Sequence, residues 1–246
     1  MSIENKQDLD GLREAGRIVR TALDEMERHT LPGVSTLKLN EIGADVLRRN
    51  QARSAPMLIY GFPAEICISV NDEIVHGIPS FQIIRTGDLV KLDVTVEKDG
   101  YIADAARTVV VGPASEERRE LVACAKRAFY KGMQVARAGN RVNAIGRAIS
   151  HEVSRGGFSI VQGLAGHGVG RAIHEEPSVP NEYDSRARRR LTVGLVLAVE
   201  PMISAGSGTV FEAEDGWTIK TADRSMTAHY ENTIVITRGQ PLILTQ

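Results

Sequence analysis

Cysteine is scarce in this chain, and so are the features of a secreted protein. Only Cys67 and Cys124 occur among 246 residues, which is too few for a disulfide framework. The opening residues, MSIENKQDLD, lack the basic and apolar regions of a signal peptide. These absences predict a protein of the reducing cytoplasm.

Long apolar runs and an excess of one charge are also missing. The longest apolar stretches are strand-sized, such as residues 195–199, whereas a membrane helix needs about 20 residues. Lys and Arg number 30 against 31 Asp and Glu, so the formal net charge is only -1. We therefore predict no membrane span and no global field that would attract nucleic acid, and any function must lie in a local site.

No linker rich in Pro, Gly or Ser divides the chain, so we predict a single domain over residues 1–246. Apolar residues recur at helical spacing between residues 8 and 30, at Leu12, Ala15, Val19, Ala22 and Met26. Further helices are expected at 36–49, 115–137, with Ser115 as N-cap, and 142–155. Strands are expected at 66–70, 89–96, 101–111, 158–161 and 193–203, and a last hairpin is expected from 218–221 and 229–237.

The order of these elements repeats. Helix, helix, strand and hairpin occur once in residues 8–112 and again in 115–240. Aligning GDLVKLD, from Gly87, with GLVLAVE, from Gly194, places Asp93 opposite Glu200. This pseudo-repeat predicts two similar α/β halves whose sheets meet, so that acids from equivalent strands converge on one centre.

The first hairpin carries a pair of acids. If Asp99-Gly100 forms a two-residue turn, Thr95 faces Asp104, and Asp93 lies diagonal to Asp104 on the same face of the sheet. The alternative is a solvated face with two unrelated acids. Because the strand at 89–96 is apolar on both faces, an Asp inside it costs several kcal/mol unless a cation or hydrogen bonds satisfy it.

Two more acids and several histidines extend this pattern. Glu200 and Glu231 each adjoin an apolar strand, and His167 lies in the glycine-rich stretch GHGVG. Four carboxylates and one imidazole favour Mn, Fe or Co in a two-metal site over a tetrahedral structural zinc. In such a site a bridging water becomes the nucleophile. His76 and His174, in loops, either line this site or are ordinary surface residues.

At these residues the sequence resembles the type I methionine aminopeptidases over nearly the whole chain. The shared motifs are NDEIVHGIP, KLDVTV with an Asp eleven residues after its own, GHGVGRAIHEEP, VLAVEPMI and YENT, in the family's order. The resemblance implies the α/β (α+β) "pita-bread" fold, with two pseudo-symmetric helix-helix-hairpin halves around a curved, mainly antiparallel sheet.

The resemblance also implies a role for each ligand. Asp93 would chelate one metal, Asp104 and Glu231 would bridge both, and His167 and Glu200 would hold the other. Two divalent ions (Co, Mn, Fe or Zn) are implied as cofactors, and Glu200 would also act as general base.

By the same resemblance, His76 and His174 would be catalytic residues that contact the substrate backbone. The methionine pocket would consist of Ile59, Phe62, Cys67, Ile173 and Trp217. The implied activity is that of a metalloexopeptidase that removes the initiator Met from nascent proteins when the second residue is small. The implied partners are the N-terminal peptides of those proteins, with the ribosome near its exit tunnel as a further candidate, and the implied oligomeric state is a monomer.

Some positions depart from the commonest family pattern. Ala105-Ala106 replaces Thr and Ser, so hydroxyl contacts to Asp104 are expected to be lost. His229 stands where Gln is frequent and is expected to reach the substrate cleft, and Asn232 stands where His is commoner. Two alternatives stay open: a proline-directed aminopeptidase or dipeptidase of the same superfamily, and a non-catalytic pita-bread binding protein.

Overall fold

The computed structural model describes residues 1–246. The helices are α1 (Lys6–His29), α2 (Thr36–Arg49), α3 (Ala55–Tyr60), α4 (Glu116–Val135) and α5 (Val142–Arg155). The strands before α4 are β1 (Arg53–Ser54), β2 (Cys67–Val70), β3 (Glu73–Val75), β4 (Leu89–Lys98) and β5 (Tyr101–Val110). The strands after α5 are β6 (Ser159–Ile160), β7 (Ala165–Gly168), β8 (Glu175–Pro180), β9 (Val196–Val199), β10 (Met202–Ser204), β11 (Val210–Glu212), β12 (Ile219–Thr221), β13 (Thr227–His229), β14 (Asn232–Val235) and β15 (Leu242–Ile243).

The four long helices begin and end within two residues of the predicted bounds. Side chains cap three of them, because the first N–H groups of a helix have no partner within it. Asn5 accepts from the N–H of Asp8, and Ser35 caps α2. The expected N-cap of α4 is confirmed, since the Ser115 side chain accepts from Arg118.

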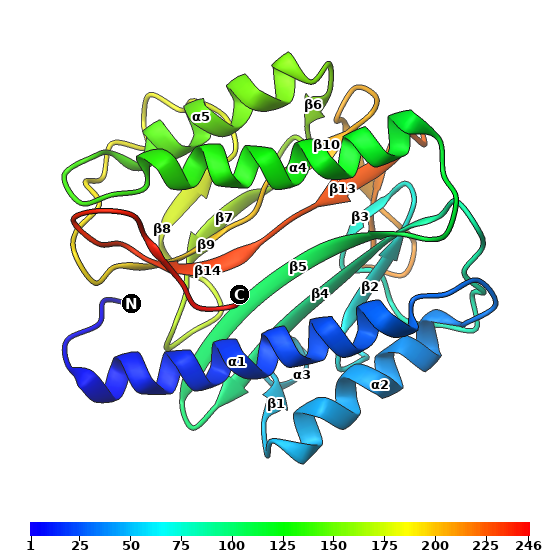
Figure 1. Ribbon diagram of the computed structural model, residues 1–246, viewed down its shortest axis with the longest axis horizontal. Coiled ribbons are helices and arrows are strands. Elements are labelled where there is room, and N and C mark those ends of the chain that lie inside the picture. The colour runs from blue at the N-terminus through cyan, green and yellow to red at the C-terminus, as the bar shows by residue number, and fades with distance from the viewer.

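Two helix pairs enclose the strands. Figure 1 shows α1 and α2 along one edge of the molecule and α4 and α5 along the opposite edge, with the strands between them. Each pair has its own hydrophobic core: Val19 and Leu92 lie in the first, and Phe129, Ile149 and Leu197 in the second. None of the helices has the length and apolar character that a membrane crossing requires.

All strand pairs are antiparallel. In the first half β4 lies between β1 and β2 on one side and β5 on the other, and in the second half the largest sheet has the order β15-β14-β9-β7-β8. Two small sheets, β13-β10-β6 and β11-β12-β3, complete the structure. The β4–β5 hairpin turns at Asp99 (φ 51°) and Gly100 (φ 82°), the left-handed pair that a tight two-residue turn requires.

The prediction of a last hairpin from residues 218–221 and 229–237 is wrong. Strand β12 pairs with β11 and β3, whereas β13 and β14 pair with β10 and β9. The expected strand at 193–203 is also divided, because Pro201 has no N–H to continue the ladder after Glu200. Two interrupted strands, β9–β10 and β13–β14, therefore pair antiparallel, and the β11–β12 hairpin lies between them in the chain.

Candidate metal centre and active site

The β4–β5 hairpin sets the first two acids in the predicted register. Lys98 pairs with Tyr101 and Thr95 pairs with Asp104, so Asp93 lies diagonal to Asp104 on the same face. The Thr95 hydroxyl donates a hydrogen bond to Asp104 Oδ1 at 2.9 Å. The hairpin thus brings two carboxylates together and orients one of them.

The second half contributes its site residues from neighbouring strands. Glu200 follows β9, and Glu231 lies between β13 and β14. His167 of β7 pairs with Ala198 of β9, which places the imidazole beside the end of the strand that carries Glu200. The backbone carbonyl of Glu200 accepts a hydrogen bond from the buried Asn181 amide at 3.0 Å.

The two halves are joined at the site itself. The N–H of Glu231 donates to the carbonyl of Ala106 at 2.9 Å, and the N–H of Ala106 donates back at 3.3 Å. Thr233 of β14 uses its hydroxyl to bond both backbone groups of Asp104. Asp104 therefore has a hydroxyl partner at its carboxylate, Thr95, and another at its backbone, Thr233, although Ala105-Ala106 offers none.

The five predicted ligands converge, and a sixth side chain joins them. One ligand atom from each of Asp104, His167 and Glu231 lies within 4.8 Å of the other two. The same limit holds for the set Asp93, His229 and Glu231. His167 Nε2 lies 3.4 Å from Glu200 Oε1, so Glu200 belongs to the same cluster.

Burial and mutual repulsion make this cluster unfavourable without a cation. Burial raises the pKa of Asp93, Glu200 and Glu231 well above the usual range of a carboxyl group, and the neighbouring acids raise it further. Burial also raises the pKa of Asp104 to about 7, against the opposing hydrogen bond from Thr95. A divalent ion would offset both the cost of burying these carboxylates and the repulsion between them. In addition, Glu231 Oε1 is buried and has no hydrogen-bond partner. The donor set therefore fits a metal ion.

Both imidazoles of the cluster are held neutral. Burial lowers the pKa of His167 to about 4 and that of His229 to about 3. A neutral imidazole has the lone pair that a metal needs. His167 Nδ1 lies 2.9 Å from the carbonyl of Gly168, which leaves Nε2 facing the acids. The expectation that His229 reaches the cleft is wrong, because its ring faces Glu200 and Glu231 and does not line the cavity described next.

A cavity of about 180 Å³ opens onto the cluster. The structure brings His76, His174, Phe62, Cys67, Ile173 and Trp217 to its walls, together with the five predicted ligands. Phe62 and Trp217 pack edge to face with ring centroids 5.2 Å apart, and Cys67 belongs to the same apolar group. One wall is thus apolar and the other is acidic.

The two loop histidines face the site. His76 has a φ of 58°, a left-handed conformation that is strained for a residue other than glycine and is found most often at functional positions. The ring of His174 lies 4.3 Å from that of His167, measured between centroids. Burial lowers the pKa of both His76 and His174, so both are neutral near pH 7.

The placement of Ile59 in the pocket is wrong. Helix α3 directs Pro56 and Tyr60 into the cavity, and Ile59 is 45% exposed on another face of that helix. The Tyr60 hydroxyl lies 2.7 Å from His174 Nδ1. Sequence reasoning missed Tyr60, although Pro56 and Tyr60 are four residues apart and so share one face of a helix.

Thr95, Thr233, Leu164 and Met202 were also missed as residues of the site or its support. Thr95 alone carried a signal, since it faces Asp104 in the predicted register. The other three lie two or three residues from His167, Glu200 and Glu231, but nothing in their own residue type marked them as part of the site.

Three buried carboxylates, the partly buried Asp93 and neutral imidazoles around one cavity, in this fold, define a metal-dependent hydrolase. Residues 10–238 match the model of metallopeptidase family M24. The chain is 47% identical over 248 residues to methionine aminopeptidase 2 of Bacillus subtilis (strain 168), with 100% of both proteins covered. The chain belongs to metallopeptidase family M24.

Solved structures agree with this assignment. A methionine aminopeptidase from Thermotoga maritima superimposes with a TM-score of 0.97 at 33% identity, over 100% of both chains. A prolidase from Pyrococcus furiosus has the same fold with a TM-score of 0.79 at 22% identity, but this chain covers only 65% of it. The pita-bread fold and the similarity to methionine aminopeptidases are confirmed, and membership of a metallopeptidase family implies the use of a divalent metal.

Proposed function

We propose that this protein is an aminopeptidase that removes the N-terminal methionine of a peptide when the second residue is small. The observation that carries the proposal is the cavity with two unlike walls. Phe62, Cys67 and Trp217 form an apolar surface against which a thioether packs well, and the acid cluster lies opposite. A cavity of about 180 Å³ suits one side chain rather than an extended peptide.

The metal ligands are proposed as the sequence indicates. Asp93, Asp104, His167, Glu200 and Glu231 would hold two divalent ions, because four carboxylates nearly balance two such charges. When bound, these ions would polarise the carbonyl of the first peptide bond and acidify a water between them.

The remaining chemistry belongs to the chain. Glu200 accepts the proton of the attacking water. It is the acid whose Oε1 lies 3.4 Å from His167 Nε2. Neutral His76 and His174 donate a hydrogen bond to the carbonyl oxygen or pass a proton to the leaving amine. The site is further proposed to require a free α-amine on the substrate, which would make the enzyme an exopeptidase.

The test is the release of free Met by metal-stripped protein, with and without added Mn or Co. The substrates are Met-Ala-Ser, Met-Lys-Ser and an Ala-Pro peptide. Metal-dependent cleavage of Met-Ala-Ser alone is expected. Cleavage of the Ala-Pro peptide would instead support the proline-directed alternative, and inactivity with every metal would support a non-catalytic binding protein.

The setting of this activity is proposed to be the cytoplasm, with a monomer acting on nascent chains at the ribosome. A groove of about 790 Å³ between α4 and α5 supports the ribosome contact. Its lining includes five cationic side chains, Lys131, Arg141, Arg147, Arg155 and Arg190. The one acid in it, Glu152, is paired with Arg127 and with Arg155 of this lining, which leaves four of the five cations without an acidic partner. A cationic groove on a chain of net charge -1 fits the phosphates of ribosomal RNA.

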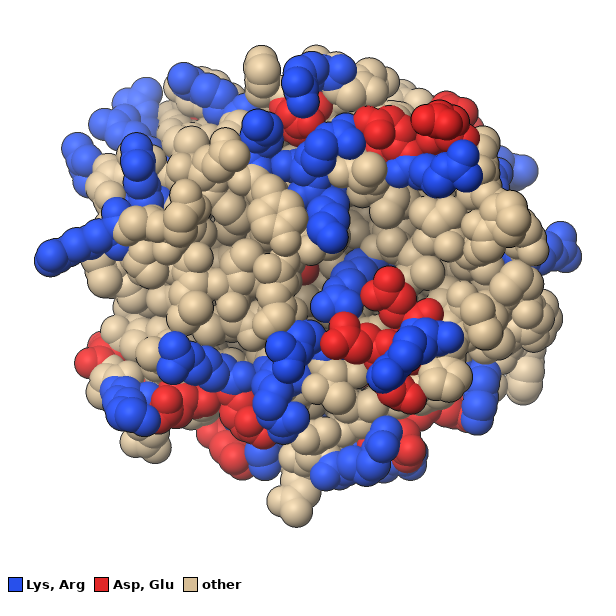
Figure 2. All heavy atoms as spheres, in the orientation of Figure 1, with Lys and Arg blue, Asp and Glu red and all other residues tan.

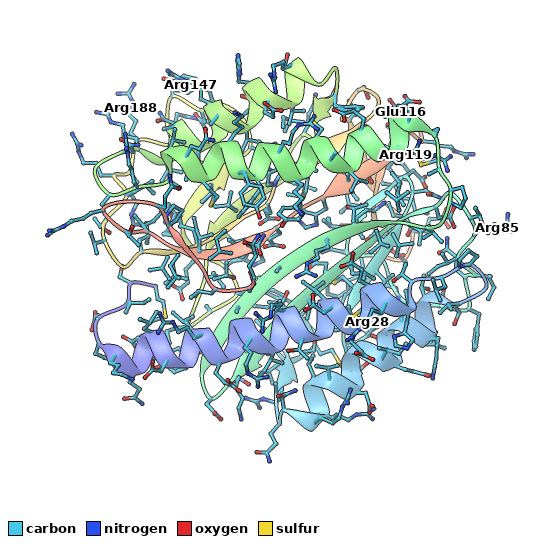
Figure 3. The ribbon with its side chains drawn as sticks, viewed as in Figure 1. Arg28, Arg85, Glu116, Arg119, Arg147 and Arg188 are labelled. Carbon is cyan, nitrogen blue, oxygen red and sulfur yellow. The ribbon has the colours of Figure 1, made fainter.

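The charge is unevenly distributed over the visible face. Figure 2 shows blue side chains gathered at the upper left and red ones at the upper right. Figure 3 places Arg147 and Arg188 at the first of these ends and Glu116 with Arg119 at the other.

The ribosome contact is tested by co-sedimentation of the double variant Lys131→Glu/Arg147→Glu at several salt concentrations.

We expect this double variant to bind ribosomes less tightly and with a shallower salt dependence. The control is Arg28→Glu/Arg85→Glu, which changes charge equally on exposed residues outside the groove. Equal binding by both double variants would remove the groove from the proposal without affecting the peptidase activity.

A further inference from the structure

His229 is a buried histidine whose ring has no hydrogen-bond partner. It lies at the end of β13 and is 1% exposed, and neither Nδ1 nor Nε2 is hydrogen bonded. A buried polar atom without a partner is costly, and native proteins contain few of them. Glu231 Oε1, two residues away, has the same property. Two neighbouring side chains thus have buried polar atoms without a hydrogen-bond partner, and these atoms are of the kinds that bind metal ions.

The backbone holds His229 in this position. Its N–H donates to the Thr108 hydroxyl at 2.8 Å, and its carbonyl accepts from the same hydroxyl at 2.8 Å. Thr108 belongs to β5, the strand that carries Asp104. The backbone of His229 is therefore fixed relative to the strand that carries Asp104.

The ring is near the acids but does not bond to them. His229 Nε2 lies 3.6 Å from Glu231 Oε2 and 3.7 Å from Glu200 Oε2, both too long for a hydrogen bond. Donor atoms of Asp93, His229 and Glu231 nevertheless lie within 4.8 Å of one another. Metal–ligand bonds of about 2.0–2.2 Å place neighbouring ligand atoms roughly 3–3.6 Å apart, so the 3.6 Å between His229 Nε2 and Glu231 Oε2 suits two ligands of one ion.

The two possible metal positions then resemble each other. One is formed by Asp104, His167 and Glu231 and the other by Asp93, His229 and Glu231, so both share Glu231 and each has one histidine. We propose that His229 is a sixth metal ligand, which supplies a nitrogen to the ion held by Asp93 and Glu231. A neutral imidazole adds no charge, so the balance of four carboxylates against two divalent ions is preserved.

This ligand changes which metals the site prefers. Without His229 the position at Asp93 would have oxygen ligands only, which suit Mn and Mg. A nitrogen ligand strengthens binding of Co and Zn more than binding of Mn. The inference rests on the metal centre of the proposed function but not on its peptide substrate.

Metal binding measures this directly. Wild-type protein and His229→Gln, which keeps a polar side chain of similar length, are titrated with Zn, Co and Mn by calorimetry. We expect one of two bound equivalents to weaken by about 10- to 100-fold for Zn and Co, and by less for Mn. The matched control is His174→Gln, a cavity histidine outside both sets of donors, which is expected to bind both equivalents as the wild type does.

X-ray absorption on the Zn-loaded protein provides a second readout that needs no activity. The wild type is expected to show one imidazole per metal ion, and His229→Gln half as many. Unchanged affinities together with an unchanged imidazole count in His229→Gln would overturn the proposal. If that variant does not fold, the wild-type count decides, since one imidazole per two metal ions excludes His229 as a ligand.

Peptide hydrolysis is measured separately. If the wild-type protein binds metal as expected but does not cleave the Met peptides, that result would count against the proposed function and leave the role of His229 intact.

Discussion

Thr233 bonds both backbone groups of Asp104 through a single hydroxyl. The N–H of Asp104 donates to Thr233 Oγ1 at 2.8 Å, and the hydroxyl donates to the Asp104 carbonyl, also at 2.8 Å. Asp104 belongs to β5 in the first half of the chain and Thr233 to β14 in the second. One hydroxyl thus ties the two halves together at a metal ligand.

Replacing Thr233 by Val keeps the shape of the side chain and removes this hydroxyl. Two buried backbone groups lose their partner, so the free energy of unfolding is expected to fall by about 1–3 kcal/mol. Metal affinity is expected to fall as well, because Asp104 loses its support. Denaturant unfolding of metal-free protein and metal titration measure the two effects. Thr192→Val, at an exposed position, is the control, and equal behaviour of the two variants would contradict the prediction.

Glu200→Gln tests the proposed general base. An amide keeps an oxygen that faces the metal but cannot accept the proton of the attacking water, so kcat is expected to fall about 10²- to 10⁴-fold. Circular dichroism is expected to stay near the wild-type value, whereas metal binding is expected to weaken because Glu200 is also a proposed ligand, so kcat is measured at saturating metal. Glu182→Gln, an exposed acid, serves as the control. A kcat near that of the wild type would remove Glu200 from this role.

Local chemistry explains why the centre of the site could be predicted. The Asp99-Gly100 turn sets the register of β4 and β5, and the register sets the relation of Asp93 to Asp104. Acids within apolar strands signalled Glu200 and Glu231 in the same way. These inferences need only the covalent neighbours of each residue.

The wrong predictions concern features that are determined by contacts with segments distant in the sequence. Successive side chains of an α-helix point in directions about 100° apart, so Ile59 and Tyr60 lie on different faces of α3. The direction of that short helix is set by what it packs against. Similarly, β14 pairs with β9 whereas β12 pairs with β11 and β3, and no local sequence pattern distinguishes these partners. The role of Thr233 depends on a partner 129 residues away.

Tyr60 is predicted to act through His174. The hydrogen bond of 2.7 Å between the Tyr60 hydroxyl and His174 Nδ1 orients the imidazole toward the cavity. Because one hydrogen bond contributes about 0.5–1.5 kcal/mol, Tyr60→Phe is expected to lower kcat/KM by up to about 10-fold without changing metal affinity. His174→Ala is expected to cost about 100-fold.

The double variant separates this role from a direct contact between Tyr60 and the peptide. If Tyr60 acts only through His174, Tyr60→Phe has no further effect on kcat/KM in the His174→Ala background. A full additional loss in the double variant would show that the Tyr60 hydroxyl works independently of the histidine.

The metal-free protein is predicted to lose stability as pH rises. Burial raises the pKa of Asp104 to about 7 and that of Asp93, Glu200 and Glu231 well above the usual range. In the unfolded chain these groups have their ordinary pKa near about 4. Between about pH 4 and 6.5 the buried histidines oppose this loss of stability, because His76, His167, His174 and His229 have lowered pKa values in the fold and take up protons only when unfolded. Above about pH 7 those histidines are neutral in both states, so the folded state binds more protons through its carboxyl groups and the free energy of unfolding falls with rising pH.

Bound metal ions reverse this trend, because they favour the ionised carboxylates. The rise in melting temperature on metal addition is thus expected to be larger at about pH 8 than at about pH 5.5, where protons compete for the same oxygens. Thermal unfolding of chelator-treated and Co-loaded protein at both pH values measures the difference. Asp104→Asn removes one of the titrating groups, so the metal-free variant should lose less stability between these pH values than the wild type. A metal-free wild type that gains stability between about pH 7 and about pH 8, above the range where the histidines titrate, would show that these carboxyl groups are not held protonated in the fold.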